Sequence, residues 1–278
     1  MNDLISVVIT TKNRINKVES AIKSVLNQTY KFIELIIVDD ASTDGTSNLI
    51  RSKYPNIILQ TNIISMGGSV ARNIGWKISK GKFIAFLDDD DQFTHDKLEI
   101  QLKAFLSNSK LSLVVCNYYS IKRNKTFISR STTKVNYKYY YKNIFGGSST
   151  YFTSKKLIEQ IDGFDEKLKS AQDWDFALKL SQIGNIYQCK KPLVLYEDYI
   201  NIDRITNSSL NTYLGHRDIY IKYSHLMKKV DSKKLLFEVL YFRKLINKIN
   251  NKHFVFILKL LLQTNIIFIT KSMFKYYK

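Results

Sequence analysis

Short apolar runs alternate with helical patterns from residue 5 to residue 87, and this alternation constrains the fold more than any other feature. The runs are rich in β-branched residues, as expected for buried parallel strands. Between them, apolar residues recur with the spacing of an amphipathic helix. We expect strands at 5–9, 34–38, 57–60 and 82–87 and helices at 14–28, 46–54 and 69–78. Such repetition predicts an α/β fold with a mostly parallel sheet flanked by helices.

The remainder of the chain divides near residue 215. Strand patterns occur at 111–116 and 148–153, and a helix is expected at 173–183. From His216 onward the sequence becomes helical in character, with fourteen Lys or Arg against three Asp or Glu, out of a net charge of +19. We therefore expect a catalytic domain at 1–215 and a basic helical extension at 216–278. Such a basic segment is typical of proteins that contact a polyanion or an anionic membrane, or it forms a solvated helical face.

Acidic residues follow two of the expected strands directly, at 39–40 and at 88–91. Ligands of open α/β sheets bind beyond the carboxyl ends of the strands, so both clusters should open onto one crevice. Four adjacent carboxylates repel one another, and a hard cation such as Mg²⁺ or Mn²⁺ would neutralise them. Asp88 and Asp90 are the best candidate metal ligands. The alternative is an exposed acidic turn.

The other polar motifs each allow a functional and a structural interpretation. At the second strand, Asp39 and Asp40 could accept a hydrogen bond from a uracil ring or could cap a helix. The stretch 67–75 contains Arg72, which suits a diphosphate, but its glycines also fit a tight turn. At 172–176, Asp173 could be a general base or a residue that the helix dipole favours. Its neighbour Trp174 could contact a sugar ring or pack in the core.

Cysteine and histidine suggest no competing chemistry. Cys116 and Cys189 are far apart in the sequence and have no metal-ligand spacing, so they are interpreted as buried residues in a reducing compartment. The four histidines form no metal-binding motif. No signal peptide is expected at the N-terminus. The apolar segment 254–269 is interrupted by Lys259, Gln263 and Asn265, which favours a buried or interfacial helix over a membrane span.

Taken in order, the motifs at 6–14, 38–46, 71–75, 86–91 and 163–175 resemble the inverting glycosyltransferases of family 2, whose catalytic domain has the GT-A fold. The resemblance covers residues 4 to 210. It implies a transferase that moves a sugar from a nucleotide donor, expected to be a UDP-sugar, to an acceptor hydroxyl. The processive polysaccharide synthases of this family, which add many sugars in succession, carry a Gln-x-x-Arg-Trp motif. That motif is missing here, so single additions are expected.

The resemblance also assigns roles to individual positions. It implies a catalytic base at Asp173 and a divalent metal, Mn²⁺ or Mg²⁺, at Asp90 and Asp88. Acceptor contacts are expected in the Gly-rich stretch at Gly147 and Ser148 and at Trp174. Arg204 would approach the diphosphate. The expected nucleotide-binding residues are Thr10, Arg14, Asp39, Asp40, Arg72, Asp88 and Asp89.

Family enzymes of this size often build bacterial O-antigen, capsule or lipooligosaccharide on a polyprenyl diphosphate carrier. The resemblance thus implies a glycan or lipid-linked saccharide acceptor and a peripheral location on the cytoplasmic face of the inner membrane. The C-terminal helices could instead pair two chains as a homodimer. A sugar nucleotidyltransferase would need a glycine-rich loop at 10–14, where there is none. A nucleic-acid binder would have to tolerate acidic clusters facing phosphate, so no nucleic-acid partner is expected.

Overall fold

The computed structural model describes residues 3–121, 125–127, 143–197 and 209–247. In this part of the chain nine strands form one sheet, in the order β3-β2-β1-β4-β8-β6-β9-β5, with β7 paired to β6. The strands are β1 (Ile5–Thr11), β2 (Ile33–Asp39), β3 (Ile58–Thr61), β4 (Phe83–Asp88), β5 (Gln92–Phe93), β6 (Leu111–Ser120), β7 (Lys125–Phe127), β8 (Phe152–Ser154) and β9 (Asn185–Tyr196). The α-helices are α1 (Val18–Leu26), α2 (Thr46–Lys53), α3 (Gly68–Ile78), α4 (Lys97–Leu106), α5 (Lys155–Gln160), α6 (Gln172–Ile183), α7 (Ser209–Tyr223) and α8 (Lys229–Asn247).

The two halves of the sheet differ in strand direction. Strands β3, β2, β1 and β4 are all parallel, as the alternation in the sequence predicts. Strand β8 then joins β4 in the antiparallel direction. Beyond it β6 and β9 are parallel to each other, whereas β5 and β7 pair antiparallel. The prediction of an α/β fold with helices on both faces of a sheet is confirmed, and the parallel part lies in its N-terminal half.

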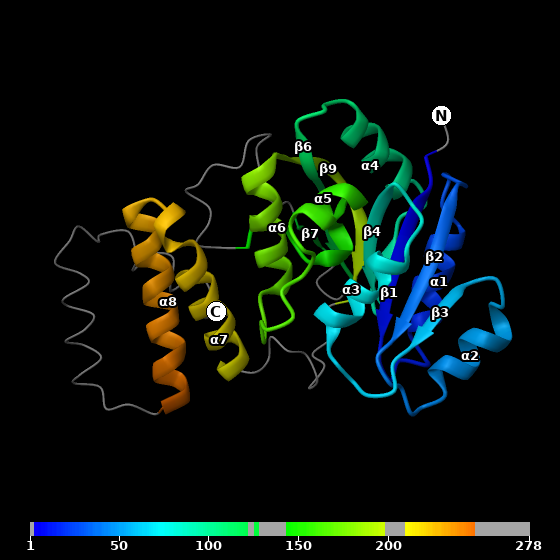
Figure 1. Ribbon diagram of the computed structural model, residues 1–278, viewed down its shortest axis with the longest axis horizontal. Helices are drawn as coiled ribbons and strands as arrows, with labels where there is room; N and C mark the ends of the chain where they lie inside the picture. The colour runs from blue at the N-terminus through cyan, green and yellow to red at the C-terminus, as the bar shows by residue number, and fades with distance from the viewer. Residues whose placement is uncertain (1–2, 122–124, 128–142, 198–208, 248–278) are drawn as a thin grey trace.

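Each face of the sheet buries its own hydrophobic cluster, because successive side chains of a strand point to opposite faces. In β1, Val7 and Ile9 pack in one cluster together with residues of α1, α2 and α4. Val8, between them, packs in the other cluster with residues of α3, α5, α6 and α7. Figure 1 shows the helices distributed around the sheet in this way. The sheet is therefore buried on both sides, and its strand ends are what remain open to ligands.

Helix α3 lies unusually close to β1. A Cβ atom added at Gly75 would come within 2.3 Å of a methyl carbon of Val8. Real Cβ atoms do not approach other heavy atoms so closely, so only glycine allows this packing. Gly75 therefore has a structural role within the stretch 67–75. The contact fixes the height of α3 above the sheet, and Arg72 lies on the same helix.

The C-terminal extension packs against the catalytic domain. The expected boundary at residue 215 falls inside α7, and Ile219 and Tyr223 of α7 are buried in the cluster that contains α6. Figure 1 shows α7 and α8 beside α6, at the opposite end of the molecule from α2. Among the described residues, no helix is long and apolar enough to cross a membrane. Residues 254–269 lie outside the described part, so the interfacial helix, the membrane contact and the homodimer stay predictions.

Several local predictions differ from the observed elements. The first helix begins at Val18, four residues later than expected, since residues 12–17 form bends and a turn after β1, and residues 12–14 line the cavity at the strand ends. The strand expected at 148–153 is a 3₁₀ turn at Ser148–Thr150 followed by β8, and this turn lies beside the acidic cluster. Helix α4 and strand β9 were not expected from the sequence.

Candidate active site at the strand ends

The carboxyl ends of β1, β2 and β4 meet at one edge of the sheet. In the strand registers, Thr10 lies opposite Asp88 and Thr11 opposite Asp39. A cavity of about 790 Å³ opens at this edge. It brings together six of the seven expected nucleotide-binding residues, together with the expected metal ligand Asp90. The residues of this set that line the cavity are Thr10, Arg14, Asp40, Arg72, Asp88, Asp89 and Asp90.

Asp39 and Asp40 have different environments although they are neighbours. Asp39 is fully buried and accepts hydrogen bonds from the Ser42 amide at 3.0 Å and from the Ser47 hydroxyl. It fastens the loop before α2 without capping that helix, whose N-cap position receives no side-chain hydrogen bond, and it does not line the cavity. Asp40 does line the cavity. The nucleotide contact expected at Asp39 stays a prediction, and the contacts seen for its side chain are structural.

The carboxylate of Asp40 accepts four hydrogen bonds from loop 62–67. Asn62 and the amide of Met66 donate to Oδ1 at 2.9 and 2.8 Å, and Ser65 and the amide of Gly67 donate to Oδ2 at 2.7 and 2.8 Å. Burial acts to raise the pKa of Asp40, but these hydrogen bonds outweigh it and lower the pKa below its ordinary value. Asp40 is therefore charged at neutral pH and holds loop 62–67 at the cavity wall.

Three of the four consecutive aspartates have different partners. Asp88 accepts hydrogen bonds from Arg72 at 2.6 Å and Ser148 at 3.0 Å. The Asp89 carboxylate lies 3.8 Å from Arg14, and burial raises its pKa to about 7. Asp91 is buried and accepts from Ser149 at 2.6 Å. These three carboxylates therefore do not converge on one point, and Asp90 lines the larger cavity.

The residues present fit a divalent cation that is completed by its substrate. Among the described residues, no three Asp, Glu, His or Cys side chains gather to hold a metal by themselves. Asp88 and Asp90, however, line the same wall of the cavity. Mg²⁺ is commonly bound by one or two carboxylates together with substrate phosphates and water. The pair matches that ligand set, with the remaining positions open to a diphosphate.

Arg72 stands between two cavities. Its guanidinium donates to Asp88 and lies 5.6 Å from the centre of the Phe164 ring. Burial acts to lower the pKa of Arg72, but the charge of Asp88 outweighs it and raises the pKa. Arg72 and Asp88 line the larger cavity and also a second one of about 390 Å³. The two cavities therefore share a charged wall.

The second cavity contains the expected catalytic base. Asp173 lies in the first turn of α6, two residues after Ala171, which adopts a left-handed conformation with φ of 60°. One oxygen of its carboxylate accepts from Asn143 at 3.0 Å, and the other accepts from the Trp174 amide at 2.9 Å. The Tyr151 hydroxyl lies 3.1 Å from the Asp173 carbonyl. The base is thus oriented by both its side chain and its backbone.

Burial and neighbouring charges act on the pKa of Asp173 in opposite directions. Burial raises the pKa of Asp173, although the Trp174 amide and the charge of Arg72 oppose this. A carboxylate whose pKa is raised toward the working pH accepts a proton more effectively than an ordinary aspartate. The expected acceptor residues Gly147 and Ser148 line the same cavity. Asp173 therefore faces small polar groups on one side and the shared Arg72–Asp88 wall on the other.

Other expected and unexpected residues complete the site. Trp174 is 2% exposed and packs edge-on against His216, so its position favours the core alternative over contact with a sugar. Arg204 lies outside the described residues. Sequence reasoning missed Tyr118 and Tyr196, whose rings are 5.2 Å apart at the second cavity, and Asn143. No motif marks these three residues; only the end of an apolar strand signals the two tyrosines.

Comparisons with known proteins agree with this geometry. The model of Glycosyl transferase family 2 matches residues 6–160, more than half of the chain. An uncharacterised glycosyltransferase of Rickettsia conorii is 44% identical over 130 residues, which are 46% of this chain and 21% of that protein. The UDP-Glc:alpha-D-GlcNAc-diphosphoundecaprenol beta-1,3-glucosyltransferase WfaP of Escherichia coli is 40% identical over 118 residues, which are 42% of this chain and 47% of that protein. The chain thus spans half or less of the length of these relatives.

A solved structure supports the fold. S. aureus TarS in complex with UDP-GlcNAc superimposes with a TM-score of 0.68 and 20% identity, over 86% of this chain and 72% of that chain. The match confirms the GT-A architecture expected from the motifs. The family model covers the strands and loops that build the larger cavity, together with the 3₁₀ turn of the second. By its motifs, its sheet and its matched residues, the chain belongs to glycosyl transferase family 2.

Proposed function

We propose that the chain transfers a sugar from a UDP-sugar to a hydroxyl of a lipid-linked saccharide, with inversion at the anomeric carbon. The observation that carries the proposal is the shared wall. One cavity holds the cationic and acidic groups that suit a nucleotide diphosphate, and the other holds a buried base, with Arg72 and Asp88 belonging to both. This arrangement supports a leaving group on one side of a sugar and an attacking hydroxyl on the other.

The chemistry follows from the positions of these side chains. A carboxylate oxygen of Asp173 accepts the proton of the acceptor hydroxyl, and the hydroxyl oxygen forms a bond to the anomeric carbon. The bond from that carbon to the diphosphate oxygen breaks, and UDP leaves. Arg72 stabilises the negative charge that develops on the leaving group. A single displacement from the opposite face inverts the configuration.

Asp88 and Asp90 would hold the divalent cation, Mn²⁺ or Mg²⁺, at the diphosphate. The cation would supply further charge stabilisation to the leaving group. Asp89 and Arg14 would contribute to the same nucleotide cavity, where the two side chains already face each other. Thr10 would contact the uracil ring, and Asp40, whose two oxygens already accept four hydrogen bonds, would hold loop 62–67 beside it.

The substrate classes are supported by named relatives. WfaP uses UDP-Glc and a GlcNAc-diphosphoundecaprenol acceptor by its name, and TarS is seen with UDP-GlcNAc. We infer that this chain also takes a UDP-hexose or UDP-N-acetylhexosamine and a saccharide on a polyprenyl diphosphate, at the cytoplasmic surface of the inner membrane. Membership of glycosyl transferase family 2 favours neither a sugar nucleotidyltransferase nor a nucleic-acid binder.

The test is nucleotide release from a panel of UDP-, dTDP-, GDP- and CMP-sugars, with Mn²⁺ or with EDTA. We expect release from a UDP-sugar that depends on the metal and that falls in Asp90→Ala. The substitution Glu159→Ala, at an exposed position of α5 outside both cavities, is the matched control and should leave release unchanged. Absence of release from every donor, together with absence of metal-dependent nucleotide binding, would rule the proposal out.

A further inference from the structure

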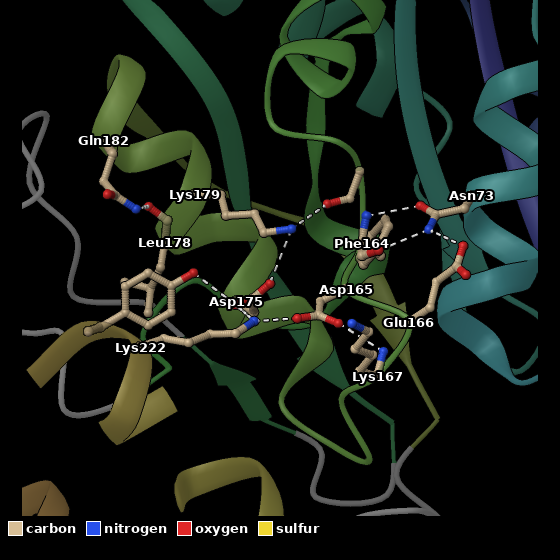
Figure 2. Close-up of polar contacts among 12 residues, drawn as sticks. Asn73, Phe164, Asp165, Glu166, Lys167, Asp175, Leu178, Lys179, Gln182 and Lys222 are labelled. Atoms are coloured by element: carbon tan, nitrogen blue, oxygen red, sulfur yellow. Dashed lines mark hydrogen bonds and ion pairs between the residues drawn. The ribbon is translucent and has the colours of Figure 1, made fainter. Parts of the chain in front are cut away.

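Helix α6 is held by α7 at a point close to the candidate base. Asp175, two residues after Asp173, is fully buried on the side of α6 that faces α7. Its carboxylate accepts hydrogen bonds from Lys222 at 2.9 Å and from the Tyr223 hydroxyl at 2.8 Å, both on α7. Lys179 of α6 itself lies 3.5 Å from the second oxygen. A buried carboxylate with these partners joins the first turn of α6 to the C-terminal extension (Figure 2).

Lys222 has a second partner on another segment. Its ammonium group also donates to Asp165, in the turn that precedes α6. Burial acts to lower the pKa of Lys222, but the two carboxylates outweigh it and raise the pKa. The ammonium group therefore stays charged and lies between Asp165 and Asp175, as Figure 2 shows. One side chain of α7 thereby connects α6 with the turn at 162–167.

The same turn is fastened to α3. The side chain of Asn73 donates to the Phe164 carbonyl at 2.9 Å and accepts from the Phe164 amide at 2.9 Å. It also donates to Glu166 at 2.8 Å. At Gly163, whose φ is 60°, an added Cβ would come within 2.5 Å of the Asn73 oxygen. Asn73 directly follows Arg72 on α3, so the turn cannot shift without a change in the surroundings of Arg72.

We propose that Lys222 is a positioning residue of the transfer reaction. By bridging Asp175 and Asp165, it fixes the helix that carries Asp173 against the turn that is fastened to the helix carrying Arg72. The distance between the base and the shared wall is then set by a residue of the C-terminal extension. The inference rests on the proposed function, because it uses the roles assigned to Asp173 and Arg72. Lys222 lines neither cavity.

The experiment compares three substitutions at the bridge with one control. Lys222→Met removes the bridge, Lys222→Arg keeps its charge, and Asp165→Asn removes only its link to the turn. Arg217→Met is the matched control, since Arg217 lies on the same helix and its contacts are to Asp218 and to the Tyr213 ring of that helix. Each protein is tested for thermal unfolding, for UDP binding by calorimetry and for transfer from UDP-glucose or UDP-GlcNAc to a short-chain GlcNAc-diphosphoprenol, with kcat and KM measured across pH.

We expect Lys222→Met to bind UDP as the wild type does and to lose kcat by roughly tenfold or more, because small misplacements of reacting groups are costly. The acid limb of its pH profile should move, since the surroundings of Asp173 change. Lys222→Arg should regain most of the loss, Asp165→Asn should fall between, and Arg217→Met should match the wild type.

Two results would overturn the inference. One is wild-type kcat and pH profile in Lys222→Met at a temperature where it is folded, since the bridge would then be only stabilising. The other is loss of UDP binding together with transfer. If Lys222→Met does not fold, Asp165→Asn decides, because it leaves the buried Lys222–Asp175 pair intact: lowered kcat supports the inference and wild-type kcat rejects it. Failure of the proposed function would appear earlier, as a wild type that uses no donor.

Discussion

The two cavities on either side of Arg72 are built from different materials. The larger one is lined by charged groups that follow the ends of parallel strands: Arg14, Asp40, Asp88, Asp89 and Asp90. The second one shares Arg72, Asp88 and Tyr196 with the first and adds small hydroxyl side chains, further glycines, Tyr118 and the carboxylates of Asp91 and Asp173. Charges suit a diphosphate, which is common to many donors. Small polar groups and aromatic rings suit a saccharide, whose shape differs from one acceptor to another. Short sequence motifs can therefore indicate the class of donor, whereas the identity of the acceptor depends on the shape of the second cavity.

The largest expected effect comes from Asp173→Asn, which removes the base from the second cavity while leaving the first intact. We expect kcat for transfer to fall about 10³-fold, because general bases contribute up to that order. Binding of UDP, measured by calorimetry, should be unchanged. Asp218→Asn on α7 is the surface control. Loss of UDP binding in Asp173→Asn would break the division between the two cavities.

The wild type should also show the base in its pH dependence. The base acts in its ionised form, and burial raises the pKa of Asp173 above the ordinary aspartate value. Transfer should therefore fall on acidification through a pKa higher than that of an exposed aspartate, whereas UDP binding should not follow the same curve. A transfer rate that stays constant down to the ordinary aspartate pKa would contradict the assignment.

Arg72→Lys should affect both cavities, because the residue belongs to both walls. Lysine keeps the charge but cannot reproduce the planar guanidinium that contacts Asp88 and lies over Phe164. We expect kcat/KM to fall roughly 10²-fold for donor and acceptor alike. Arg51→Lys, which changes an exposed arginine bonded to Thr61, should have the activity of the wild type. An effect confined to one substrate would show that the wall is not shared.

Tyr118→Ala should act on the acceptor alone. Tyr118 lines the second cavity but not the first, and its ring contacts Tyr196. Removing the ring should raise the KM for the acceptor about tenfold, equivalent to about 1.4 kcal/mol of binding, and leave the KM for the UDP-sugar unchanged. Tyr118→Phe keeps the ring and should restore the wild-type value. A raised KM for the donor would argue against the assignment of the second cavity.

The smallest effect on activity is expected at Lys97, which lies in neither cavity. Lys97 is fully buried, donates to Gln101 at 2.6 Å, and burial lowers its pKa from 10.5 to about 8. Because the unfolded chain binds the proton more tightly, the charged form costs roughly 3 kcal/mol of stability below pH 8. That cost should disappear as pH rises from 8 to 10.5. Lys97→Met removes it at all pH values.

Chemical denaturation at several pH values measures this cost. The wild type should gain stability relative to Lys97→Met between pH 8 and pH 10.5, with transfer activity alike in both proteins. Lys103→Met, on the exposed side of the same helix, is the control and should show no such pH-dependent difference. A stability difference that does not change with pH would mean that the pKa of Lys97 is the same in the folded and the unfolded protein.

The donor side could be predicted from sequence because its residues follow strands directly. Thr10, Asp40 and Asp88 end or follow apolar runs, so their common edge was implied by the alternation alone. What each aspartate faces could not be predicted. Asp91 turns to Ser149 and Asp89 to Arg14, and these partners come from segments far away in the chain. The choice between Asp39 and Asp40 likewise depends on which side of the sheet each residue faces.

The acceptor side was harder to predict because long-range packing builds it. Three separate segments contribute to the cavity of Asp173. Asn143 donates a hydrogen bond to its carboxylate, and Tyr118 and Tyr196 line the same cavity. Strand β9 went unpredicted because Lys190, Lys191 and Pro192 interrupt its apolar pattern, where the pairing with β6 shifts register. Helix α4 begins at the buried Lys97, a residue type that sequence reasoning places on the surface.

The close packing of α3 on β1 affects how sequence variation in this chain should be interpreted. Any side chain at Gly75 would push α3 away from Val8, and Arg72 and Asn73 would move with it. The first of these belongs to both cavities and the second holds the turn before α6. In a mutational scan scored by activity, Gly75 would therefore group with residues that contact substrate, although it lines neither cavity. A glycine at a helix–sheet contact can therefore be as sensitive to substitution as a residue of the active site.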